Sequence, residues 1–229
     1  MQLAALAAVL SYFSKDVGGL VRGTVRAIQD RNFEAPAFRL AAGILLATIP
    51  IGIVGLMLSS QLNACNSQFR SLRVIAISCI VMAILLGISE LTCAHSRRVG
   101  NMRLRDALIV GLAQVGALIP GVSRSGSTLT GALFLNFRRE DAAQFSFLLG
   151  LPAIALAGLK EVWVLYQAHI PLEAWQHLIF GLIVGSLSAF VAIWGLMRFL
   201  EKFSTWIFVI YRAALGLALL VALSNGWLA

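Results

Sequence analysis

One polar stretch stands out in this chain, Pro120-Gly121-Val122-Ser123-Arg124-Ser125-Gly126-Ser127-Thr128. It lies between two apolar runs, residues 107–119 and 129–137. Glycines and hydroxyl side chains before an apolar helix favour anion binding, since the free N–H groups of a helix N-terminus attract negative charge. Arg124 adds a planar guanidinium that can donate to two phosphate oxygens. The stretch therefore predicts an anion site that is shaped for phosphate.

The composition places this stretch in a membrane protein. Of the 229 residues, 59% are hydrophobic and 12% are charged, and the mean hydropathy is +0.88. Soluble domains average about 25% charged residues. We expect an all-α, polytopic helical membrane protein with about six spanning segments and one re-entrant helix-loop-helix, forming a single domain over residues 1–229. The net charge of +8 does not indicate a nucleic-acid partner, because the basic residues lie in loops, where they set membrane orientation.

Apolar runs of about 20 residues predict the spanning helices. These runs are residues 40–58, 74–89, 145–166, 175–199 and 206–223, and a shorter apolar segment covers residues 1–13. Pro50 and Pro152 lie inside two of the predicted spans, which membrane helices tolerate because neighbouring groups satisfy the freed carbonyl. Residues 17–28 are expected to form an interfacial helix.

Loop charge predicts that residues 107–137 enter and leave the membrane on the same side. Basic residues number five in loop 14–39, two in 59–73, four in 90–106 and none in 167–174. Because basic loops stay in the cytoplasm, the basic loop 138–141 fits this alternation only if residues 107–137 do not cross. The 13 residues of the first apolar run make only about 20 Å of helix, enough to reach mid-bilayer. We therefore expect a re-entrant hairpin over 107–137.

Two alternatives stay open for the charged groups. In a purely structural reading, Ser127 or Thr128 caps a helix, and Arg124 snorkels or pairs with a carboxylate. Against this reading, a cap needs only one hydroxyl, and this stretch has no acidic residue to pair with the arginine. Arg212, in the last span, either binds the same anion or pairs with Glu90 or Glu161. An arginine at membrane depth marks a functional site by default.

The chain resembles a known family at several places. Residues 111–128, GLAQVGALIPGVSRSGST, closely resemble the second signature of the undecaprenyl-diphosphate phosphatase family, the bacitracin-resistance type. Residues 142–154, AAQFSFLLGLPAI, and the pair Tyr211-Arg212 also resemble that family. The resemblance covers nearly the whole chain, and it implies two inverted repeats that each open with a re-entrant hairpin.

The resemblance implies an acid anhydride hydrolase of the bacterial plasma (inner) membrane. Such enzymes convert undecaprenyl diphosphate to undecaprenyl phosphate, which recycles the carrier lipid of peptidoglycan synthesis, serves cell wall biogenesis and cell shape, and confers bacitracin resistance. The expected partners are this diphosphate and membrane lipid, at a site reached from the outer leaflet, and a homodimer stays open. Carried over by position, the catalytic residues are Arg124, Ser123 and Thr128, and the substrate-binding residues are Gly121, Ser125, Gly126, Ser127 and Arg212.

This sequence departs from the family at its first signature. That signature has two glutamates three residues apart and a P-x-S-S-x-G-H run, and residues 1–9 resemble the stretch that follows it. We therefore expect Met1 to be an internal methionine, and the chain to be the remnant of an inverted repeat. A divalent metal, Mg or Ca, is compatible with the family, but its ligands are not expected in this chain. Gln114 stands at a position like that of the first glutamate, and an amide cannot act as a general base.

The departure leaves more than one function open. Hydrolysis needs charge neutralisation and proton transfer, and the tip residues supply little of the second. This chain alone is expected to bind polyprenyl phosphates weakly and to hydrolyse them poorly. The alternative is a polyprenyl-phosphate binder or transporter without hydrolysis, since inverted repeats and a midplane anion site also characterise transporters. A third option is a structural remnant.

Overall fold

A computed structural model describes residues 2–58, 71–167 and 172–227, and within these ranges the regular structure is helical apart from one isolated β-bridge. The main helices are α1 (Gln2–Tyr12), α2 (Ser14–Gln29), α3 (Pro36–Met57), α5 (Leu72–Thr92), α6 (Leu104–Val115), α7 (Arg124–Phe134), α8 (Arg139–Gln167), α9 (Leu172–Lys202) and α10 (Trp206–Ser224). Two short 3-10 turns, Val99–Asn101 and Gly116–Leu118, flank α6. The all-α architecture predicted from the composition is confirmed.

Five of these helices are long and apolar enough to cross a membrane: α3, α5, α8, the Trp175–Lys202 part of α9, and α10. The count rises to six if α1 and α2, which meet at 77°, form one broken span. Four of the five long predicted spans fall within one of these helices, and the fifth, 40–58, extends one residue past α3; Pro50 lies inside α3 and Pro152 inside α8. The predicted loops 59–73 and 167–174 lie largely outside the described residues.

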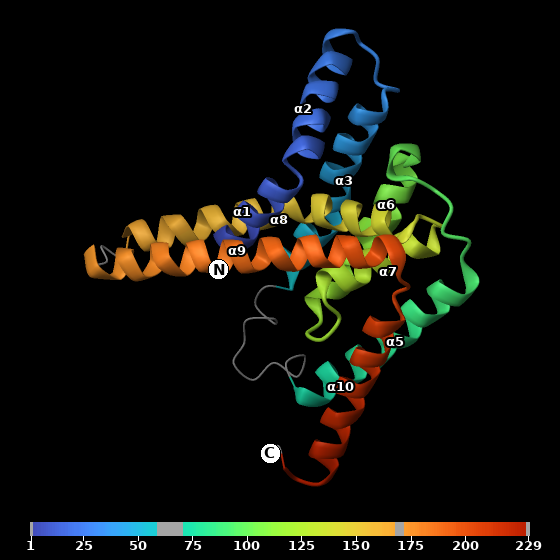
Figure 1. The fold of residues 1–229 in the computed structure, drawn as a ribbon, viewed down its shortest axis with the longest axis vertical. Helices are drawn as coiled ribbons and strands as arrows, with labels where there is room; N and C mark the ends of the chain where they lie inside the picture. The colour runs from blue at the N-terminus through green and yellow to red at the C-terminus, as the bar shows by residue number, and fades with distance from the viewer. Residues whose placement is uncertain (1, 59–70, 168–171, 228–229) are drawn as a thin grey trace.

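The helices form three groups that meet at the α6–α7 hairpin (Figure 1). In Figure 1, α2 and α3 project upward, α8 and α9 run side by side to the left, and α5 packs along α10 below. α1 lies against α8 and α9, α6 packs on α3, and α7 contacts both α8 and α5. The predicted interfacial segment, residues 17–28, is helical and packs beside α3.

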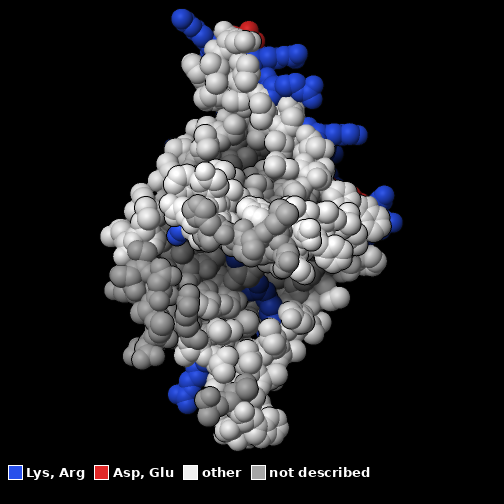
Figure 2. Space-filling view, turned by 90° about the vertical axis from the view of Figure 1, so that its left-hand side faces the viewer, with Lys and Arg blue, Asp and Glu red and all other residues white. Residues whose placement is uncertain are grey.

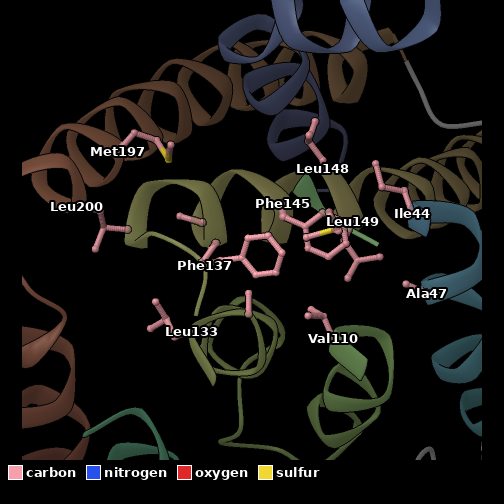
Figure 3. Close-up of a cluster of buried hydrophobic side chains, with 14 of the residues drawn as sticks. Ile44, Ala47, Val110, Leu133, Phe137, Phe145, Leu148, Leu149, Met197 and Leu200 are labelled. Carbon is pink, nitrogen blue, oxygen red and sulfur yellow. The ribbon is translucent and has the colours of Figure 1, made fainter. Parts of the chain in front are cut away.

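The apolar core lies between the hairpin and α8. Figure 3 shows Phe137, Phe145 and Leu149 close together above Leu133 and Val110. All five side chains are fully buried. The core therefore joins both helices of the hairpin to a spanning helix, which fixes where the tip of the hairpin lies.

The two ends of the hairpin lie together, as the prediction for residues 107–137 requires. Arg97 pairs with Asp106 at the start of α6, and its Nη1 donates to the Leu135 carbonyl at 3.0 Å, just after α7. The Arg97 N–H also donates to the Asn136 carbonyl at 2.9 Å. The first helix begins at Leu104, three residues before the predicted boundary, because the Asp106 carboxylate accepts the Arg103 N–H at 3.0 Å and starts the helix there. Re-entry of this hairpin into a membrane stays a prediction.

Candidate functional site

The tip of the hairpin is a tight turn that leads into α7. Gly121 has φ +93° and Ser123 has φ 66° with ψ 127°, a conformation that is costly for a residue with a side chain. Ser123 caps α7, since its Oγ accepts the Gly126 N–H at 3.4 Å. Among the described residues, the N–H groups of Arg124 and Ser125 make no hydrogen bond. They are the free donors that the start of a helix offers to an anion.

Two other helices hold the tip in place. Gly121 packs on the backbone of α5: a Cβ there would lie 2.6 Å from the Ile75 carbonyl oxygen. From α10, Arg212 reaches the turn and donates from Nη1 to the Val122 carbonyl at 2.9 Å. Gly121 adopts the positive φ that a glycine allows, and the close approach it permits is to α5.

Each of the two arginines at the tip lies against a glycine. A Cβ built on Gly150 of α8 would lie 2.8 Å from Nη2 of Arg124, and one built on Gly126 would lie 2.6 Å from Nη2 of Arg212. Gly126 is helical and does not use the positive φ that a glycine allows. Its missing side chain instead makes room for the second guanidinium. Each of the two glycines, by lacking a side chain, therefore leaves the space that an arginine guanidinium occupies.

Two adjoining cavities open beside these arginines. Arg212 lines a cavity of about 130 Å³, together with Ser123 and Gly126. Arg124 lines a cavity of about 420 Å³. The two cavities share four residues, Ser125, Ser146, Phe147 and Leu196. Figure 2 shows basic atoms recessed within a face that is otherwise mostly uncharged. Two guanidinium groups and the exposed hydroxyls of Ser123 and Ser125 thus line this pair of adjoining cavities, which we call the hollow.

Ser127 and Thr128 do not face this hollow. Both are buried, and their hydroxyls donate to the Arg124 carbonyl at 3.0 and 2.9 Å. The Thr128 hydroxyl also lies 2.6 Å from Ser146 Oγ on α8. The ligand contacts predicted for these two residues are therefore not available in this arrangement. The reason is helical phase: α7 begins at Arg124, so residues 127 and 128 turn toward α8. They support the tip from behind.

Within the part of the chain that the structure describes, no carboxylate pairs with Arg124 or Arg212. Glu90, one predicted partner of Arg212, instead accepts from Arg139 Nε and from Thr205 Oγ1, each at 2.8 Å. Glu161 lines a separate cavity with His177. The described residues hold no group of three or more His, Cys, Asp or Glu that could bind a metal. Guanidinium groups and neutral hydroxyls fit an anion, and they do not fit a divalent cation.

Gln114 on α6 is a second unusual polar group. Its side chain is fully buried, and neither amide atom has a hydrogen-bond partner among the described residues. It lines none of the cavities beside the arginines. An uncompensated buried amide costs about 1–3 kcal/mol per group.

Comparison with known proteins places this arrangement in a family. The family model of the bacitracin resistance protein BacA matches residues 1–218. The chain belongs to this family. Members with a similar sequence include undecaprenyl-diphosphatase 2 of Mesorhizobium japonicum, 62% identical over all of this chain and 87% of that protein. The undecaprenyl-diphosphatases of Synechocystis and Myxococcus xanthus are 46% and 44% identical over 99% of this chain, which corresponds to 70% and 75% of their own lengths. The part of the chain that matches the family model includes the tip of the hairpin and Arg212.

Two residues of α8 in this BacA family member, Gly150 and Ser146, contribute to the tip although their sequence pattern predicted no role for them. Both were part of the resembling run. Together with Ala142 they form a buried column of small residues spaced by four, which faces α7. Such a column on a membrane helix indicates close packing of a neighbour. The sequence signal that could have identified this column is its position shortly after the polar stretch that contains Arg124.

Proposed function

We propose that this membrane protein hydrolyses undecaprenyl diphosphate to undecaprenyl phosphate and inorganic phosphate. Water attacks the terminal phosphorus, the phosphoanhydride bond breaks, undecaprenyl phosphate leaves, and the protons of the water pass to the phosphate products. The observation that carries the proposal is the seating of Arg124 and Arg212 on either side of Ser125 at the hollow. Membership of the BacA family and the names of the relatives favour hydrolysis over binding or transport alone.

The two arginines have distinct tasks in this proposal. A diphosphate carries two phosphate groups, and each guanidinium can bind the oxygens of one of them. The free N–H groups of Arg124 and Ser125 complete the donor set. Because negative charge builds up on the leaving phosphate as the bond breaks, fixed donors around it lower the barrier. Ser123 and Ser125 add hydroxyl donors, and Thr128 and Ser127 keep the tip rigid.

The lipid tail fits the apolar walls of the same hollow. Ile193, Leu196 and Leu200 of α9 line the two cavities, with Phe208 of α10. These side chains suit a polyprenyl chain and exclude water from the diphosphate, which strengthens its contacts with the arginines. A divalent cation is compatible with phosphatase chemistry, but the side chains at the tip do not fit one.

The proposed place of action is the bacterial inner membrane. A multi-pass protein with an apolar hollow around its anion site takes its substrate from the bilayer, and we place the opening toward the outer leaflet, where the loop-charge pattern puts residues 167–174 and the tail. The recycled lipid then serves peptidoglycan synthesis, which is the basis of bacitracin resistance. The proposal includes association of two copies of this chain as a homodimer.

Phosphate release from undecaprenyl diphosphate tests the proposal. The purified chain is compared with Arg124→Ala and Arg212→Ala, and with Arg198→Ala as a control that removes an exposed arginine from α9. We expect each tip variant to lower kcat about 100- to 1,000-fold, the usual effect of losing a donor that stabilises transition-state charge. The control should keep its rate. Lipid binding without any phosphate release by the unaltered chain would favour the binding alternative.

A further inference from the structure

A second cluster of arginines lies at the opposite end of the hairpin from its tip. Here α3 and α6 run in the same direction and pack closely through small residues. A Cβ on Gly43 would lie 2.9 Å from Ala107 Cβ, and one on Gly111 would lie 2.5 Å from the Ala47 carbonyl oxygen. One turn before this contact, the same register brings Arg39 of α3 next to Arg103 at the start of α6.

These arginines line a basic cavity. The cavity is an open groove of about 270 Å³ lined by Arg39, Arg103, Leu104 and Arg105, and no acidic residue lines it. None of the three guanidinium groups makes an ion pair with another part of the chain that the structure describes. Holding like charges side by side is unfavourable unless an anion lies between them.

A larger cavity of about 680 Å³ adjoins the first and shares Arg39 and Arg103 with it. Two acidic residues line this larger space, Glu34 and Asp106. Asp106 is already paired with Arg97 and accepts the Arg103 N–H, so it does not neutralise the cluster. The excess positive charge therefore faces the smaller cavity.

An apolar stripe on α6 begins at this basic cavity. Leu104, Leu108 and Leu112 are spaced by four residues, which places them on one face of the helix. They are 39%, 39% and 62% exposed. The cavity lies at the membrane boundary of the predicted span α3, so the arginines are at headgroup depth and the leucines extend toward the bilayer centre.

We propose that Arg39, Arg103 and Arg105 bind the headgroup of an anionic phospholipid whose acyl chain lies along Leu104, Leu108 and Leu112. The basic cavity matches the charge of a phosphodiester, and the stripe matches an acyl chain. Juxtamembrane arginines also set orientation without binding any particular lipid. What favours a bound lipid is the position of the three arginines around one open groove, which is continuous with the apolar surface of α6.

Binding of single lipids to the purified full chain tests this site. Native mass spectrometry gives the affinity for phosphatidylglycerol and for phosphatidylcholine of the same acyl length. The test variant is Arg39→Gln/Arg103→Gln/Arg105→Gln, and the matched control is Lys15→Gln/Arg22→Gln/Arg26→Gln, which removes the same charge from exposed positions on α2. Phosphate release from undecaprenyl diphosphate is measured in parallel and serves as a check on folding.

We expect the unaltered chain to prefer phosphatidylglycerol, and the test variant to lose about 100-fold in affinity, since each basic side chain near an anionic headgroup contributes about a factor of five. The control should change less than threefold, and both variants should release phosphate normally. Equal losses in the two variants would show general charge attraction and overturn the proposal. Displacement of the lipid by millimolar inorganic phosphate would also overturn it, because the leucine stripe would then contribute nothing.

Discussion

Arg124 and Arg212 are costly residues to bury, and two glycines determine where each can lie. A guanidinium taken out of water needs donors, acceptors or charges in fixed positions to offset the loss of hydration. Gly150 and Gly126 lie so close to the two guanidinium groups that an added Cβ would be 2.8 Å from Nη2 of Arg124 or 2.6 Å from Nη2 of Arg212. Arg212 is therefore restrained by shape and by its hydrogen bond to the Val122 carbonyl, and Arg124 is restrained by shape. In the proposed site, neither guanidinium has to reorganise to bind a diphosphate.

Gly150→Ala is predicted to lower phosphate release by displacing Arg124. Alanine is about 1 kcal/mol better than glycine inside a helix, so a loss of activity cannot come from a weaker α8. We expect kcat to fall about tenfold or more, because a donor shifted by an ångström no longer meets the developing charge. The control is Gly195→Ala on α9, where an added Cβ meets nothing within 4 Å.

A double-mutant cycle distinguishes positioning from a general packing defect. If Gly150 acts only through Arg124, then adding Gly150→Ala to Arg124→Ala should cause no further loss of kcat. Equal effects of Gly150→Ala in the presence and absence of the arginine would contradict the role assigned to this glycine.

The tip residues also mark how far sequence reasoning reaches. Arg124, Ser123 and Ser125 were predicted because polar residues between two apolar runs need a reason. Ser127 and Thr128 were predicted to contact the ligand, and in the structure both are buried with their hydroxyls donating to the Arg124 carbonyl, because the phase of α7 depends on the residue at which that helix begins. One residue of shift turns a side chain by about 100° around a helix. Arg212 packs against Gly126, and because the two residues are far apart in the chain, no local sequence pattern predicts this contact.

Among the elements, the α6–α7 hairpin is stabilised mainly by close packing. Small residues let α6 approach α3, and the core around Phe137 and Phe145 fixes α7 on α8. The hairpin over 107–137 could be predicted from loop charge, because basic residues recur on one side of the membrane. Its partners could not, since apolar periodicity identifies a buried face and not the helix that covers it.

Gln114→Met is predicted to stabilise the protein. The amide of Gln114 is buried on α6 without a partner in the described part of the chain, and methionine has a similar shape without unsatisfied polar groups. Removing the penalty should add about 1–3 kcal/mol to the free energy of unfolding. Thermal unfolding in detergent measures the change as a higher Tm.

The matched control for this substitution is Gln144→Met on α8. Gln144 donates to Asp16 Oδ1 at 2.9 Å at an exposed site, so we expect no gain from its replacement. A lower Tm for Gln114→Met than for the control would mean that the Gln114 amide has polar partners after all.

At the scale of the whole molecule, the predicted topology gives the two membrane sides different charge. The predicted alternation puts the basic loops 14–39, 90–106 and 138–141 in the cytoplasm and the tail outside. The proposed access route from the outer leaflet depends on this orientation. The spans follow from composition alone, whereas the side from which the hollow opens depends on how α9 and α10 pack around the tip.

Cysteine labelling of intact cells tests the orientation. In a variant without native cysteines, Gly100→Cys, Ser224→Cys and Ser125→Cys are probed with a membrane-impermeant thiol reagent. We expect the reagent to label position 224 and, more slowly, position 125 at the tip, and to spare position 100 until the cells are opened. Labelling of position 125 only in opened cells would refute access from the outer leaflet.

The most direct test of the paired-arginine site is the affinity for an uncleavable diphosphate. A farnesyl methylenediphosphonate is compared with farnesyl phosphate on the unaltered chain, Arg124→Ala, Arg212→Ala and Arg198→Ala. If each guanidinium binds one phosphate group, the unaltered chain prefers the diphosphonate, and each tip variant loses about tenfold or more of that affinity while Arg198→Ala loses none. Equal affinity for the two ligands, or full diphosphonate binding without Arg212, would contradict the site described for this protein.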